Sequence, residues 1–193
     1  MLAYRKKLIT AAAEEPVTLA EARNWLKMPS STANDAIISG LISAARSHIE
    51  EVFSCALVSQ TWDFYLDNLK EDGWREVRFH FGPIQSVTHF KYYYSGTATD
   101  WDAANYTLDT AGLIPRIGLN ENVFWPSPDN RINAVEIRVV AGYGAASAVH
   151  EDIKTAIKLL VAMWHENRED MPLNNNYGRA AYSLLRNKFV WTI

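Results

Sequence analysis

The spacing of apolar residues changes twice along the chain, which predicts helices near both ends and strands between them. In the first part, apolar side chains recur every three or four residues, the period of a helix with one buried face. The clearest stripe consists of Ile38, Ile42, Ala45, Ile49 and Val52. It predicts a long helix whose apolar side packs on a core.

A shorter helix is expected before this one, beginning at Thr18. Thr18 followed by Glu21 has the form of a capping box, in which each side chain bonds the other residue's backbone N–H. Pro29 predicts an end near Met28, because proline cannot continue the helical hydrogen bonds. Residues 1–15 contain an apolar stretch too short for a signal peptide, and they are expected to be a flexible lead.

From about residue 57 the period changes to two, which is typical of antiparallel strands with one buried face. Three segments alternate in this way, and their inward positions are Trp62, Phe64 and Leu66, then Val77, Phe79 and Phe81, then Val135, Ile137 and Val139. Glycine and proline between them indicate turns. Residues 57–145 are therefore predicted to form an antiparallel β section.

The helical period returns after Val149. One stripe contains Ile153, Ile157, Leu160, Val161 and Trp164, and Lys158 is the one charged residue between Ala156 and Trp164. A helix that is apolar on nearly all sides is buried on more than one side. We expect a neighbouring subunit to supply part of that burial. A last short helix is predicted between Ala180 and Phe189.

The order of helices, strands and helices predicts an α+β fold. Residues 16–56 and 146–193 are expected to form a small helical bundle, into which the antiparallel β section 57–145 is inserted. The net charge of −3 provides no electrostatic footprint for wrapping nucleic acid. The single cysteine, Cys55, excludes an internal disulfide and is expected to be a small buried apolar side chain.

Gly142 and Gly144 stand between a predicted strand and a predicted helix, where many proteins bind phosphate. A dinucleotide fingerprint needs glycine where Ser147 stands, and a P-loop needs a lysine that is absent. We interpret these glycines as a sharp turn. The stretch from His165 to Glu169 lacks the second histidine of a zinc protease motif. Neither a metal site nor a cofactor is expected.

Two other classes of function remain open from the residues. The β section contains Trp62, Trp74, Trp101 and Trp125, so a carbohydrate- or peptide-binding module is an alternative, because aromatic faces stack on such ligands. Asp100 and Asp102 could supply the two carboxylates of a hydrolase. Aspartates in loops more often make local turn hydrogen bonds, so we rank the hydrolase last.

Several short segments occur in a characteristic order. They are Pro16–Ala22, Ala44–Arg46, Ser59–Trp62, Gly82–Val87, Val139–Gly144, Asp152–Lys154 and Trp164–Glu169. In this order the chain resembles the head–tail connector (adaptor) proteins of tailed bacteriophages and related prophages, in the longer subgroup with a β insertion. The resemblance extends from Pro16 to Asp170.

The resemblance implies a structural virion protein at the head–tail junction, made in the cytoplasm of the bacterial host, and not an enzyme. Such connectors form a ring of about a dozen subunits beneath the portal protein. The ring extends the channel used in DNA packaging and genome ejection, and it offers a surface to a downstream tail or head-closure protein. DNA passes through without specific binding, and neither a cofactor nor a membrane is implied.

In this family the helical part forms the body of the ring, and the C-terminal segment reaches toward the portal. On that basis we expect eight residues at a subunit or portal interface. They are Ile157, Leu160, Trp164, Arg168, Glu169, Arg179, Arg186 and Lys188.

Overall fold

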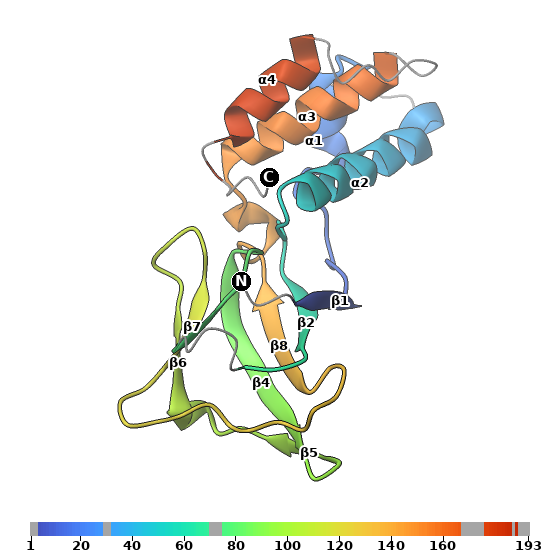
Figure 1. Ribbon diagram of the computed structural model, residues 1–193. Helices are drawn as coiled ribbons and strands as arrows, with labels where there is room; N and C mark the ends of the chain where they lie inside the picture. Colours follow the sequence, from blue (N-terminus) through green and yellow to red (C-terminus); the bar gives the residue numbers. More distant parts are fainter. Residues whose placement is uncertain (1–3, 29–31, 70–74, 167–175, 187, 189–193) are drawn as a thin grey trace. The chain divides into compact units, whose positions relative to one another are not determined.

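The structure is a computed structural model that describes residues 4–28, 32–69, 75–166, 176–186 and 188 (Figure 1). The chain divides into two compact units, each built from separate stretches of sequence. Unit 1 comprises Met1–Ala12 and Ser59–Gly142, and unit 2 comprises Ala13–Val58 and Tyr143–Ile193. The strands belong to unit 1 and the α-helices to unit 2, which confirms the predicted α+β fold.

Unit 1 contains two antiparallel sheets. The larger has the strand order β1-β2-β8-β4-β5, and the smaller has the order β3-β7-β6. The strands of the larger sheet are β1 (Arg5–Thr10), β2 (Gln60–Leu66), β4 (Ile84–Tyr94), β5 (Thr97–Asp100) and β8 (Val135–Ala141). Those of the smaller sheet are β3 (Glu76–Arg78), β6 (Tyr106–Asp109) and β7 (Arg116–Leu119), with a short 3-10 turn, Ala103–Asn105, just before β6.

The alternation along β8 explains how the larger sheet is buried on one side. Val135, Ile137 and Val139 are buried, whereas Glu136 and Arg138 between them are only half-buried. The ring of Phe64 on β2 packs edge-on against Phe79, with 5.0 Å between ring centroids. The predicted two-residue period is thus confirmed, because these apolar side chains form the core of unit 1.

Residues 5–10 are not the flexible lead that we expected. They form strand β1 at the edge of the larger sheet and pair antiparallel with β2, so that Lys7 lies opposite Asp63. Arg5 fastens the strand through ion pairing with Asp67 and a hydrogen bond of 2.8 Å to Asn133. All six residues of β1 are exposed, so no period of two marks this strand in the sequence.

Helix α1 (Leu19–Trp25) begins as predicted. Thr18 accepts a hydrogen bond from the N–H of Glu21, and the Glu21 carboxylate accepts one from the N–H of Thr18, which confirms the capping box. The helix ends before Met28, earlier than predicted. Lys27 takes a positive φ of 53°, and the N–H of Met28 bonds the carbonyl of Arg23, which closes the last turn.

The other helices of unit 2 pack around α3 (Glu151–Glu166), which lies between α2 (Asp35–Val52) and α4 (Asn176–Leu185) in Figure 1. The predicted stripe of α2 is buried except for Val52, which stands exposed in the last turn. The final helix starts at Asn176 rather than Ala180, because Gly178, Ala181 and Leu185 share its buried face. Cys55 is buried, as predicted.

Candidate functional site

A buried ion pair lies on the second face of the larger sheet in unit 1. Asp63 on β2 stands directly opposite Arg138 on β8, and the guanidinium donates Nε to Oδ1 at 2.6 Å and Nη2 to Oδ2 at 2.8 Å. Burial acts to raise the pKa of Asp63, but the hydrogen bonds and charge of Arg138 outweigh it and lower that pKa. The same hydrogen bonds raise the pKa of Arg138.

Two further titratable side chains, His89 and Glu136, join this pair. Nε2 of His89 lies 2.8 Å from Oε1 of Glu136, and acceptor atoms of Asp63, His89 and Glu136 lie within 4.8 Å of one another. Both oxygens of Asp63 already accept hydrogen bonds from the guanidinium of Arg138, so a metal ion here would have to compete with that cation. Arg138 lies against both carboxylates, 2.6 Å from Asp63 and 4.0 Å from Glu136, so the cluster is better explained as ion pairing than as a metal site.

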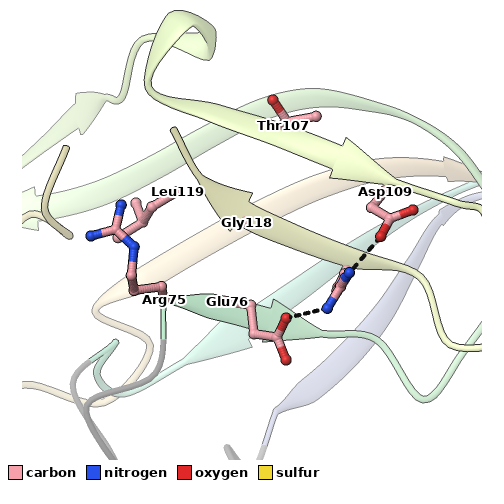
Figure 2. Close-up of a pocket in the computed structure, with 7 residues that line it drawn as sticks. Arg75, Glu76, Thr107, Asp109, Gly118 and Leu119 are labelled. Carbon is pink, nitrogen blue, oxygen red and sulfur yellow. Dashed lines mark hydrogen bonds and ion pairs between the residues drawn. The ribbon is translucent and has the colours of Figure 1, made fainter. Parts of the chain in front are cut away.

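The outer side of the smaller sheet carries a shallow pocket of about 410 Å³. Figure 2 shows Arg75 and Asp109 at its two ends, with Glu76 and Thr107 between. Arg116 bridges the two acids in the pocket, with Nε 2.9 Å from Asp109 and Nη1 2.8 Å from Glu76.

Arg116, Glu76 and Asp109 in this pocket form ion pairs with one another. Hydrogen bonds lower the pKa of Asp109, the largest from the N–H of Ala111 and the next from Arg116. Hydrogen bonds to Asp109 and, second, to Glu76 raise the pKa of Arg116. Arg75 donates a hydrogen bond of 2.8 Å to the carbonyl of Asn120. A general acid or base needs a pKa moved toward neutrality, and these shifts run the other way. The pocket is best explained as structural ion pairing on a strand surface.

The two glycines after β8 act as the predicted turn. Gly142 and Gly144 have φ values of 118° and 120°, a region that side chains disfavour, and they bend the chain away from β8. Helix α3 starts only at Glu151, and Glu151 and Asp152 occupy its first turn. Two carboxylates at a helix start repel phosphate, so the structure agrees with a turn and not with a phosphate site.

Three of the expected interface residues are core residues of the subunit itself. Ile157 and Leu160 are 0% and 1% exposed and Trp164 is 8% exposed, because α1, α2 and α4 surround α3. We therefore revise the expectation that a neighbouring subunit completes the burial of this helix. The apolar side chains of α3 are covered by helices of the same chain.

The five charged residues that we expected at an interface lie in different structural settings. Arg168 and Glu169 lie outside the described residues. Lys188 forms an ion pair of 3.1 Å with Asp152. This ion pair links the residues that follow α4 to the first turn of α3. Arg179 and Arg186 are exposed on α4, and they remain candidates for an interface.

The tryptophans of the β section do not form an open stacking platform in the part of unit 1 that the structure describes. Trp101 stacks on Tyr106 with 5.5 Å between ring centroids, and Trp125 stacks on Phe90 at 6.1 Å, so each ring already has an aromatic partner. Trp62 is half-buried beneath Lys6, and Trp74 lies outside the described residues.

The hydrolase candidates likewise have structural roles. The Asp102 carboxylate accepts a hydrogen bond of 2.8 Å from the N–H of Ala104 and so caps a short 3-10 turn. Asp100 is exposed at the end of β5, 4.0 Å from Lys91. These are the local turn and surface contacts expected of loop aspartates.

A surface that we did not single out from the sequence lies on α2. Ten residues from Ala36 to Ala45 contain no charge, although the helix has an exposed side along that length. The missing charge is visible in the sequence, but only the structure shows which of these residues are exposed.

Within the described residues, the helices are all too short or too polar to cross a lipid bilayer. No protein-family model and no curated protein matches the chain.

Solved structures do match it over nearly its whole length. A chain from the neck of an empty gene transfer agent (GTA) particle, computed with C6 symmetry, has a TM-score of 0.80 and 25% identity, over 98% of this chain and 97% of that chain. A chain from the neck of a native GTA particle, computed with C12 symmetry, has a TM-score of 0.75 and 25% identity over the same shares. A chain from the virion of the native GTA particle has a TM-score of 0.77 and 24% identity, over 97% and 96%. The chain therefore has the fold of the neck proteins in these particles.

Proposed function

We propose that this protein is a structural, non-enzymatic subunit of a virion neck, and that it forms an adaptor ring beneath the portal protein. One observation carries the proposal. The match to neck chains covers 98% of this chain and 97% of the neck chain, so it includes both units rather than a shared core.

The chemistry of the surface supports a structural role. In each of the two charged clusters described above, an arginine pairs with the carboxylates, Arg138 with Asp63 and Arg116 with Glu76 and Asp109, as in structural ion pairing. The net charge of −3 suits a ring that lets DNA pass, because tight binding of phosphates needs an excess of lysine and arginine.

The symmetry of the similar particles supports the ring. Necks computed with C6 and C12 symmetry contain repeated copies of their chains around one axis. We infer that copies of this protein repeat in the same way, that the ring continues the DNA channel, and that its far side receives a tail or head-closure protein.

The test is the native mass of the purified protein, alone and mixed with the portal protein from the same genome. A ring in either sample, with a whole-number ratio to the portal subunits, is the expected result. A protein that stays monomeric at high concentration and does not bind the portal contradicts the proposal.

A further inference from the structure

The side of α2 that faces away from its own core is uncharged for three turns. Its exposed residues there include Ala36, Ile37, Gly40 and Ala44, and the Ile37 side chain is 44% exposed. Helices that face water normally carry charge at such positions. We call this side the α2 face, and its members are Ala36, Ile37, Gly40, Ala44, Ser47 and Glu51.

Gly40 in the middle of the α2 face is not required by the subunit itself. A Cβ atom at this position would have no heavy atom within 4 Å, so an alanine would fit. Glycine inside a helix is nevertheless less stable than alanine. Ala36, Gly40 and Ala44 are four residues apart and share one side, where they form a shallow strip against which another backbone can pack closely.

Helix α4 offers a second exposed side with complementary character. Ala181 and Leu185 are buried, and the opposite positions are exposed. We call this side the α4 face, and its members are Arg179, Ala180, Ser183 and Arg186. Small residues lie at its centre and an arginine at each end.

The two faces lie on different helices, as a closed ring of identical subunits requires. Ring contacts join two different patches of each subunit, so the patches must point in different directions. Helix α3 lies between α2 and α4 in unit 2 (Figure 1). The exposed residues of each face lie opposite the buried residues of the same helix.

The charges of the two faces also correspond. Glu51 is exposed at the C-terminal end of the α2 face, seven residues after Ala44. Arg186 is exposed six residues after Ala180 on the α4 face. With the helices parallel and Ala180 against Ala44, both charges therefore lie about 10 Å further along their axes.

From this we propose that the α2 face of one subunit packs against the α4 face of the next copy of the same chain. The inference rests on the proposed function, because the neck computed with C12 symmetry supplies the reason to expect a second copy as the occupant. In it, Gly40 allows the helices to approach closely, and Glu51 pairs with Arg186 across the contact.

The first experiment places a bulky side chain at the centre of the α2 face. Gly40→Trp is expected to weaken ring assembly at least tenfold, measured by native mass alone and on the portal. The matched control is Ala20→Trp, which enlarges an exposed alanine on α1 outside both faces. Circular dichroism and thermal melting establish that both variants are folded.

A charge exchange tests the pairing without adding bulk. Glu51→Arg and Arg186→Glu are each expected to weaken assembly. The double variant restores it, because every contact then joins one exchanged residue from each copy. A double variant that assembles no better than either single variant overturns the pairing.

Failure of this inference can be told apart from failure of the proposed function. If Gly40→Trp forms rings like the wild type, the α2 face is not the contact, while the neck assignment stands. If Gly40→Trp forms rings but no longer binds the portal, the face belongs to the portal and our proposal is overturned. If the wild type forms no ring and ignores the portal, the proposed function itself fails.

Discussion

Arg138 and Asp63 lie directly opposite each other on neighbouring strands and form two parallel hydrogen bonds, at 2.6 Å and 2.8 Å. The Asp63 side chain is 2% exposed and that of Arg138 is 32% exposed. The aspartate can be buried on this face of the sheet only because the arginine accompanies it. The pair therefore joins β2 to β8 on the side away from the apolar core.

Removing the charge of Asp63 is expected to lower the free energy of unfolding by about 2–3 kcal/mol, since charge-assisted hydrogen bonds are lost and a half-buried arginine remains. Asp63→Asn is the variant, and urea unfolding is the measurement. The control is Asp100→Asn, which removes an exposed pair and should change stability by less than about 0.5 kcal/mol. Equal effects in the two variants would contradict this role for the buried pair.

The lowered pKa of Asp63 predicts a loss of stability in acid. In the unfolded chain an aspartate titrates near pH 4. Because the folded pKa lies lower, the pair contributes fully above about pH 4, and its contribution disappears as the pH falls through the folded value. Urea midpoints between neutral pH and pH 2 measure this, and a double Asp63→Asn, Arg138→Met variant should show a shallower decline. An unchanged decline would assign the acid sensitivity to other groups.

Gly40→Ala is expected to change stability and assembly in opposite directions. The unfolding free energy of the subunit should rise by about 0.5–1 kcal/mol, because alanine loses less backbone entropy in a helix. Assembly should weaken several-fold, since a methyl group keeps the helices further apart. Thermal melting of the monomer and native mass of the ring report the two effects. A variant that is more stable and also assembles better would refute the role of Gly40 in close packing.

Thr18→Ala should cost about 1 kcal/mol, because the capping box of α1 loses its hydroxyl acceptor. The residue lies on neither of the two proposed ring faces, so assembly of the folded protein should be unaffected. Thermal melting combined with native mass separates the two quantities. Loss of ring formation by a fully folded variant would show that α1 takes part in the contact.

Ile157→Ala is expected to lower stability by about 2–5 kcal/mol, because a fully buried side chain leaves a cavity. Arg186→Ala removes an exposed side chain, so it should lower stability by less than Ile157→Ala does and should reduce assembly. Urea unfolding and native mass of both variants test this division between core and contact. A stable Ile157→Ala protein that fails to assemble would return α3 to the interface.

The local elements of the fold could be predicted where one period governs a long segment. The stripe of α2 and the alternation along β8 each divide a buried from an exposed side, and the structure has both. Strand β1 has no such division, since all six of its residues are exposed. Its conformation depends on hydrogen bonding to β2, more than fifty residues later, and no local pattern reports that.

The candidate sites depend on partners that the sequence does not reveal. Asp63 and Arg138 are 75 residues apart, so their pairing follows from strand order and not from a motif. The apolar length of α3 correctly indicated burial on several sides, but helices of the same chain supply it. A pattern of apolar residues shows how much of a helix is covered, and it does not show which chain covers it.

The division of each unit between distant stretches has a consequence for synthesis on the ribosome. Strand β1 is made first but has no partner until β2 emerges, and the larger sheet is complete only when β8 has followed. Helices α1 and α2 in turn wait for α3, which comes after the entire β section. Contacts this far apart in sequence slow folding and leave apolar surface uncovered meanwhile. The nascent chain therefore completes neither unit before β8, at Val135–Ala141, has been translated.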